Sequence, residues 1–326
     1  MKKILCALLG ILMMLSVFTL VSCEKEPETV KFGMGVLISA SATDATDEKD
    51  GQGKATTNVA AITVDADGKV VACQLDTADF TVKYTVEGKA IANDSFKTKY
   101  EQGADYNMIA FGGATKEWFE QADAFESMVV GKTLDEIKAL VAEGGKGNAD
   151  VIAAGCTITV TEFVGAIEKA FANLADSNAT AESAIKLGIN AAQTTTDATE
   201  EKNGNNQIDV TVVAAAVNAD GTVAAIASDC VQYKFGFTLA GASAFDATKT
   251  VKSKRELGAD YGMVAYGGAA KEWFEQADIF NGLCIGKTPA QIVALCAADN
   301  YGTDEVKAAG CTVLVDGFAK AADKLD

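Results

Sequence analysis

Apolar runs separated by glycine turns open each half of the chain. Residues 56–64 (TTNVAAITV) lead through a DADGK turn into 70–75 (VVACQL), a pattern that predicts a β-hairpin. Residues 80–86 (FTVKYTV) predict a third strand. The same succession returns at 208–217 (IDVTVVAAAV) and 223–228 (VAAIAS), followed by YKFGFTL. These β-rich segments predict antiparallel strands joined by tight turns.

Helical periodicity follows the strands. Residues 115–130 carry apolar side chains at spacings of three and four, which define one helical face: Trp118, Ala122, Phe125 and Val129. The opposite face carries Glu117 and Glu120, and we expect it to be solvated. A capping box predicts another helix start at Thr133, and 161–171 predicts a last helix.

The order of these elements indicates the fold class. A short strand is expected at 158–160, before the last helix. Strands are otherwise grouped ahead of helices, which favours an α+β fold with an antiparallel sheet and packed helices over alternating βαβ units.

A long internal repeat organises the whole chain. The segment 103–125 (GADYNMIAFGGATKEWFEQADAF) returns at 258–280 with an offset of 155, and the upstream turns return with an offset of 153. A repeat this long predicts two complete domains in tandem rather than a solenoid. We place the first repeat at 31–175, a small polar linker at 176–185 and the second repeat at 186–326.

The amino-terminal segment has the pattern of a secretory leader. Two lysines precede an apolar run that ends in Leu-Val-Ser-Cys, so we expect residues 1–22 to be a lipoprotein signal peptide and Cys23 to be the lipidated residue. Residues 23–30 would then form a tether that holds the protein at the extracytoplasmic face of the cell membrane. The alternatives are an ordinary leader cleaved nearby or an uncleaved membrane helix.

Composition removes several functions. The net charge of −17 disfavours nucleic acid as a partner, because such a surface repels phosphate backbones. The chain contains no histidine, which excludes histidine-ligated metals and catalytic pairs that depend on imidazole. No C-x-x-C motif and no recurring acid/base constellation are present, so we expect neither a metal site nor catalytic residues.

Cysteines are sorted by whether they recur in the repeat. Only Cys156 and Cys311 do, each inside an Ala-Ala-Gly-Cys-Thr segment at 153–157 or 308–312. The other cysteines of the repeats fit small buried hydrophobic positions, with a disulfide between Cys284 and Cys296 as the alternative. The recurring step is either a tight turn or a site where Thr157 and Thr312 offer hydroxyl groups beside flexible glycines.

The ordered motifs GADY, KEWFEQA, GKT and glycine-x-threonine resemble the FMN-binding domains of bacterial flavinylated surface lipoproteins used in extracellular electron transfer. That resemblance implies FMN in phosphoester linkage to a threonine, transferred by an FMN transferase. It matches Gly155 and Gly310 to the glycine of the family motif, and Thr157 and Thr312 to the modified threonine. Cys156 and Cys311 replace an alanine of that motif.

A flavin also requires a flat wall and room for its ring. The candidates are Tyr106, Tyr261, Gly112, Gly113, Gly267 and Gly268, together with the Phe111 and Tyr266 pair. Trp118 and Trp273 are better explained as core residues, because they lie on an apolar helical face.

The leading hypothesis is therefore an electron carrier rather than an enzyme, with two covalent FMN groups, a membrane electron donor and an extracellular acceptor. A lipoprotein that binds flavin or another small molecule noncovalently is one alternative. A structural or adhesive surface antigen, in which the Gly-Cys-Thr step is only a turn, is the other.

Overall fold

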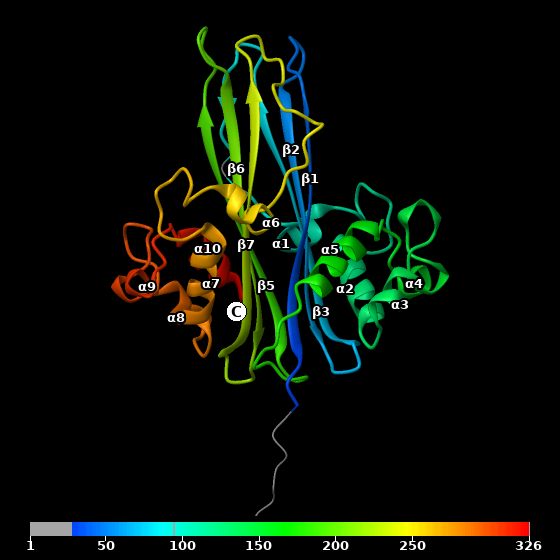
Figure 1. Ribbon diagram of the computed structural model, residues 1–326. Coiled ribbons are helices and arrows are strands. Elements are labelled where there is room, and N and C mark those ends of the chain that lie inside the picture. The colour runs from blue at the N-terminus through cyan, green and yellow to red at the C-terminus, as the bar shows by residue number, and fades with distance from the viewer. Residues whose placement is uncertain (1–27, 94, 326) are drawn as a thin grey trace, which may run out of the picture.

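Two antiparallel sheets packed face to face form the centre of the molecule, and helices cover the lower part of the outer face of each sheet, whereas the upper ends of the strands extend beyond the helices (Figure 1). The computed structural model describes residues 28–93 and 95–325. The expected leader, the lipidation site Cys23 and most of the tether lie outside these described residues. The layers run helix, sheet, sheet, helix, which confirms the α+β class with antiparallel sheets.

The strands are longer than the apolar runs suggest. The first sheet has the order β1 (Lys31–Thr43), β2 (Gly51–Val64), β3 (Val70–Tyr84) and β4 (Ala90–Ile91), and the second has the order β5 (Ala184–Thr196), β6 (Gly204–Val217) and β7 (Val223–Phe237). Both predicted hairpins are confirmed. The separate strands expected at 70–75 and 80–86 are one continuous strand, β3, because every residue between them continues the ladder with β2.

Helices follow each sheet in the same order. The first set is α1 (Lys99–Gln102), η1 (Gly103–Tyr106), α2 (Trp118–Val129), α3 (Leu134–Lys138), η2 (Glu143–Gly145), α4 (Ala149–Ala154) and α5 (Thr161–Ala172). The second set is α6 (Lys254–Leu257), η3 (Gly258–Tyr261), α7 (Trp273–Cys284), α8 (Pro289–Val293), α9 (Asp304–Ala309), α10 (Asp316–Ala322) and η4 (Asp323–Leu325). The three predicted helices are confirmed. The short strand expected at 158–160 is wrong, since Thr159 makes only an isolated bridge with Lys146.

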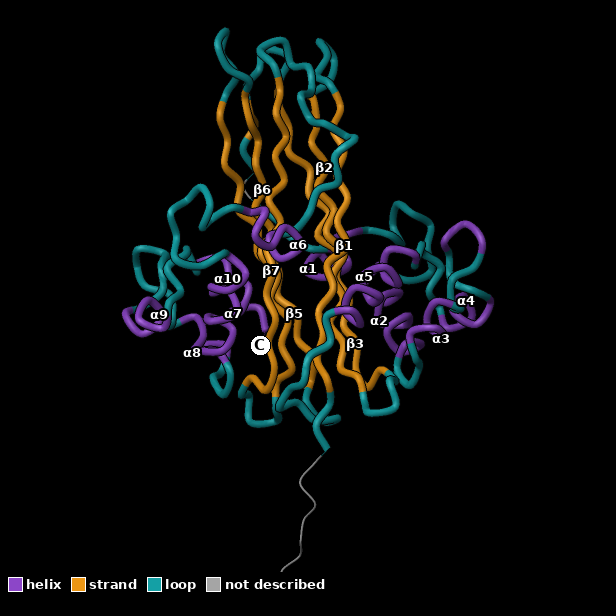
Figure 2. The backbone as a smooth tube through the Cα atoms, viewed as in Figure 1, coloured by secondary structure: helices purple, strands orange, loops and turns teal. Residues whose placement is uncertain are grey.

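Both faces of the central strands are buried over residues 57–64 of β2 and 210–217 of β6, which explains the continuous apolar runs there. Along β2, Val59 and Ala61 face the other sheet, whereas Ala60 and Ile62 face the helices. β6 repeats the alternation. Successive side chains of a strand point to opposite faces, so each central strand contributes to two cores at once. Helices on both sides of the paired sheets complete these outer cores (Figure 2).

The apolar pattern did not predict β1, because glycines interrupt it. A β-carbon at Gly35 would collide with the backbone oxygen of Ala166 in α5, and one at Gly33 would collide with that of Ala170. Gly188 of β5 meets Ala321 of α10 in the same way. These positions therefore need glycine for the close approach of a helix, although glycine weakens the strand signal.

The two sheets meet through paired, reciprocal contacts. Tyr84 stacks on Phe237 with ring centroids 4.5 Å apart, and these residues hold the same position in the two repeats. The amide of Ala45 donates to the oxygen of Gly241, and that of Ala198 donates to Gly88, both at 2.8 Å. The two halves are thus related as in an isologous dimer.

The ion pairs between the two helix layers are also reciprocal, because they join equivalent positions of the two repeats. Lys169 of α5 reaches Glu256 of α6, and Lys324 of η4 reaches Glu101 of α1, both at 2.5 Å.

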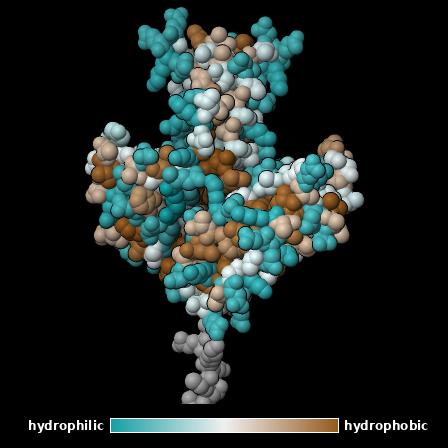
Figure 3. All heavy atoms as spheres, turned by 45° about the vertical axis from the view of Figure 1, so that its right-hand side comes forward, coloured by the Kyte–Doolittle hydropathy of each residue, from teal (hydrophilic) through white to brown (hydrophobic). Residues whose placement is uncertain are grey.

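Hydrophilic side chains gather at the far ends of the strands, and hydrophobic ones are visible between the helical lobes (Figure 3). Within 28–93 and 95–325, no helix is long and apolar enough to span a membrane.

The expected linker is shorter than predicted, because β5 begins at Ala184 within the 176–185 range. Backbone hydrogen bonds fix the rest of the linker and the residue before it. The amide of Val30 donates to the oxygen of Ala179, and Phe32 exchanges backbone hydrogen bonds with Ala175. The segment thus closes against β1 as a packed connection.

Candidate functional site

The Gly-Cys-Thr step forms the exit from a short helix in both repeats. Gly155 is the C-cap residue directly after α4 and has a φ of 103°, in the left-handed region, and Gly310 caps α9 with a φ of 104°. This conformation is disfavoured for residues with a β-carbon. At Gly155 a β-carbon would also collide with the side chain of Lys116. The chain turns sharply there and leaves Thr157 exposed.

A buried glutamine holds each threonine. The amide and the hydroxyl of Thr157 both donate to Oε1 of Gln121, at 2.8 and 2.9 Å. Gln276 accepts from Thr312 in the same way, at 2.8 and 3.0 Å. Nε2 of Gln121 donates to the oxygen of Lys116 at 3.0 Å, which fixes the orientation of the amide. Both hydroxyls therefore sit at defined positions on the surface.

Sequence analysis missed these glutamines. Gln121 and Gln276 are each 1% exposed, and they lie in the KEWFEQAD segments that recur most closely. The available signal was a polar residue kept in both copies at a position on the apolar side of a helix.

A cavity of about 420 Å³ lies beside Thr157 on the helix-facing side of the first sheet. Its floor is formed by β1, β2 and β3, and its walls by the α1–α2 segment and the α4–α5 connection. Tyr106, Met108, Trp118 and Phe163 supply the aromatic and apolar wall. Thr157 and Tyr106, both candidates from the sequence, thus border one cavity of a size usual for small-molecule sites.

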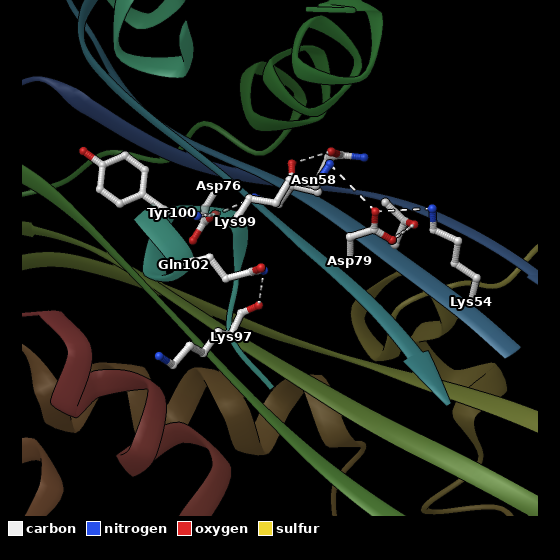
Figure 4. Close-up of polar contacts among 10 residues, drawn as sticks. Lys54, Asn58, Asp76, Asp79, Lys97, Lys99, Tyr100 and Gln102 are labelled. Atoms are coloured by element: carbon white, nitrogen blue, oxygen red, sulfur yellow. Dashed lines mark hydrogen bonds and ion pairs between the residues drawn. The ribbon is translucent and has the colours of Figure 1, made fainter. Parts of the chain in front are cut away.

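Charged side chains line the same cavity. Lys54 and Lys99 approach the carboxylate of Asp79 from opposite sides, at 3.3 and 3.8 Å (Figure 4). Lys146 and Glu162 also belong to its lining. On the floor, Thr77 donates to Asn58 at 2.7 Å. The cavity therefore combines a flat apolar wall with more ammonium groups than carboxylates.

The glycine pairs lie on a loop next to the site rather than in the cavity lining. The buried Glu117 carboxylate accepts from the amides of Met108 and Ile109, at 2.8 and 3.3 Å, and so pins the base of this loop. Glu272 holds the corresponding loop of the second repeat. The expectation of a solvated face for Glu117 is wrong, because its side chain caps both α2 and this loop.

The loops present aromatic residues to solvent. Gly112 and Gly113 follow Phe111, which is 88% exposed, and Gly267 and Gly268 follow Tyr266, which is 92% exposed. Gly113 and Gly268 have positive φ values of 65° and 66°. In the second repeat, Tyr261 lies under the ammonium of Lys254, as Tyr106 lies under that of Lys99.

The thiols of the two Gly-Cys-Thr steps point into the protein. Cys156 and Cys311 are fully buried in the two outer cores, and burial raises the pKa of both thiols. The six cysteines in the described part of the chain are free, so the alternative disulfide between Cys284 and Cys296 is absent there. Cys284 instead donates to the oxygen of Phe280.

Trp118 has two roles. It is 4% exposed and packs in the outer core against Phe163, as expected from its helical face, and it also borders the cavity. Trp273 packs against Phe318 in the second repeat. Among the described residues, no cluster of three or more acidic or cysteine side chains is arranged to hold a metal ion.

A comparison with protein-family models, curated proteins and solved structures finds no match to this chain. The functional argument therefore depends on the sequence motifs and on the geometry of the site.

Proposed function

We propose that the protein is an extracytoplasmic electron carrier made of two FMN-binding domains in tandem, with one FMN covalently linked to Thr157 and one to Thr312. The observation that carries this proposal is the position of Thr157. Its exposed hydroxyl is fixed by Gln121 at the edge of a cavity that also contains Tyr106, Trp118 and basic side chains.

The donor set of the cavity suits a flavin nucleotide. An isoalloxazine ring matches the aromatic wall at Tyr106 and Trp118, and a phosphate matches the ammonium groups of Lys54 and Lys99. When bound, FMN would supply reversible one- and two-electron redox chemistry. The protein residues hold and orient the ring, and a covalent link prevents loss of the cofactor by dilution outside the cell.

The presence of one equivalent site in each repeat is supported by the matching element order of the repeats and by their reciprocal contacts. In this proposal Cys23 carries the lipid anchor, an FMN transferase modifies both threonines, and electrons pass from a membrane donor to an extracellular acceptor. Because Thr157 and Thr312 are exposed, a modifying enzyme could reach them without unfolding either domain.

Mass spectrometry tests the attachment. Coexpression with an extracytoplasmic transferase that moves FMN from FAD to each threonine hydroxyl and releases AMP should add two FMN groups, each with the mass of FMN less one water. Thr157→Val and Thr312→Val should each remove one of these additions. Thr159→Val is the matched control, because Thr159 lines the same cavity two residues away and should leave the modification intact. Unmodified peptides containing Thr157 and Thr312 in the coexpressed protein would refute covalent attachment. A flavin that is bound natively but lost on a denaturing gel would favour the noncovalent alternative.

A further inference from the structure

Each repeat places one lysine ammonium between two aromatic rings. Nζ of Lys99 lies 5.2 Å from the ring centre of Tyr106 and 5.8 Å from that of Trp118. Nζ of Lys254 lies 5.0 Å from Tyr261 and 5.2 Å from Trp273. Both lysines are the first helical residue after an N-cap hydroxyl, Thr98 or Ser253. The same short helix thus aims a cation at the same aromatic pair twice.

The first of these cations belongs to the cavity beside Thr157. Lys99, Tyr106 and Trp118 all line it, and the Lys99 side chain is only 16% exposed. Its carboxylate neighbour is Asp79, which is also paired with Lys54 at a shorter distance. One carboxylate is therefore shared by two ammonium groups, and positive charge remains uncompensated in the cavity.

The second cation lacks a directly paired carboxylate. Gln232 occupies the position of Asp79 in the second repeat, where it accepts from the hydroxyl of Tyr261 at 3.2 Å. Lys254 makes no ion pair within residues 28–93 and 95–325. Burial opposes its charge, but Cys230, Tyr261 and the carboxylate of Asp209 hold its pKa above the usual value. Cation–π contacts stabilise such a group only partly when it is withdrawn from water. An anionic ligand would add a direct ion pair to this ammonium.

We propose that Lys99 and Lys254 recognise the phosphate of the flavin nucleotide, so that each site distinguishes a phosphate-bearing flavin from a neutral one. This inference rests on the proposed function and assigns the phosphate-binding residue of each site. Tyr106 and Tyr261 are only half-buried and can offer ring surface to the flavin beside the ammonium, so one cluster recognises both parts of the ligand.

Binding of free FMN and of riboflavin to the protein purified without a transferase tests the assignment. Riboflavin has the same ring system without the phosphate. The wild-type protein should bind FMN about tenfold more tightly or better, since a hydrogen bond to a charged group discriminates at that level. The double variant Lys99→Met, Lys254→Met should lose this preference while its riboflavin affinity stays the same.

Three further variants separate recognition from a structural role. Lys99→Arg with Lys254→Arg keeps the charge and the ring contacts, and should preserve the FMN preference. Asp79→Gln copies the second repeat and should strengthen FMN binding at the first site, because it releases both lysines. Lys31→Met removes an exposed lysine remote from the cavity and should change nothing.

Equal affinity of the wild-type protein for FMN and riboflavin, no detectable binding of either, or a preserved preference in the double methionine variant would overturn the assignment. These outcomes are separate from the attachment test. Flavin mass on Thr157 without discrimination leaves the covalent proposal standing, whereas discrimination without attachment supports phosphate recognition alone.

Discussion

Glu126 is a carboxyl group buried between α2 and β3, where its Oε1 accepts from the amide of Leu75 at 2.6 Å. Its pKa is raised from 4.5 to about 8, mainly by burial and also by the nearby Asp123 and Asp76, while the hydrogen bond from Leu75 lowers it. Burial also raises the pKa of Asp76 to about 6. Asn281 occupies the position of Glu126 in the second repeat, so the buried acid is particular to the first.

This shift predicts how stability depends on pH. Between 4.5 and about 8 the folded protein retains a proton on Glu126 that the unfolded chain releases, so the free energy of unfolding should fall as the pH rises. Glu126→Gln should flatten that fall and leave the contributions of Asp76 and Asp229, two further acids whose pKa is raised by burial. Urea unfolding across this range measures the effect, and Glu143→Gln, at an exposed position, is the control. An unchanged slope in Glu126→Gln would contradict the burial of a protonated acid.

Gln121 carries a second prediction at the residue scale. Gln121→Leu removes the acceptor for both the amide and the hydroxyl of Thr157, which should cost about 1–3 kcal/mol of stability. It should also reduce flavin attachment at Thr157 while attachment at Thr312 continues. Peptide mass spectrometry compares the two sites within one molecule, so the second repeat serves as an internal control. Equal loading of both sites would show that Gln121 does not position the hydroxyl.

At the scale of elements, the contact between β1 and α5 depends on glycine. Gly35→Ala would force a β-carbon against the backbone oxygen of Ala166, so we expect a loss of about 1–3 kcal/mol. Gly282 in α7 has no atom within 4 Å of the position of its β-carbon, and Gly282→Ala should instead stabilise by about 1 kcal/mol. Urea denaturation of both variants gives opposite signs if the packing is as described. A neutral Gly35→Ala would mean that the helix can move away from the strand.

At the scale of the whole molecule, the core between the sheets joins the two repeats into one cooperative unit. Ile208 is fully buried there with residues of both sheets. Ile208→Ala should cost about 2–5 kcal/mol and should destabilise both halves together. Because each repeat holds one tryptophan, Trp118→Phe and Trp273→Phe backgrounds report on one half each. Adding Ile208→Ala in each background and finding a shift only in the second half would contradict a shared core.

Short-range structure and the candidate site residues could be predicted from the sequence. The hairpins at residues 56–75 and 208–228, the helix over Trp118–Val129 and the cap at Thr133 follow from short-range patterns of apolar periodicity, turn glycines and backbone capping. The repeat placed Thr157 and Thr312 at equivalent positions. Hydroxyl, tyrosine and glycine candidates could be named because their chemistry is carried by residue type alone.

Tertiary contacts decided the rest. β1 contains glycines because α5 packs directly against its backbone and leaves no room for a β-carbon. Glu117 is buried because its carboxylate accepts hydrogen bonds from loop amides, such as that of Met108, which the helical pattern does not reveal. Gln121, Lys99 and the cavity residues come from separate segments, so no local signal could assemble them. The packing of the sheets against each other was likewise invisible, since an apolar strand face does not reveal its partner. Sequence determined the chemical groups and the local elements, and only the folded chain brought those groups within reach of one another.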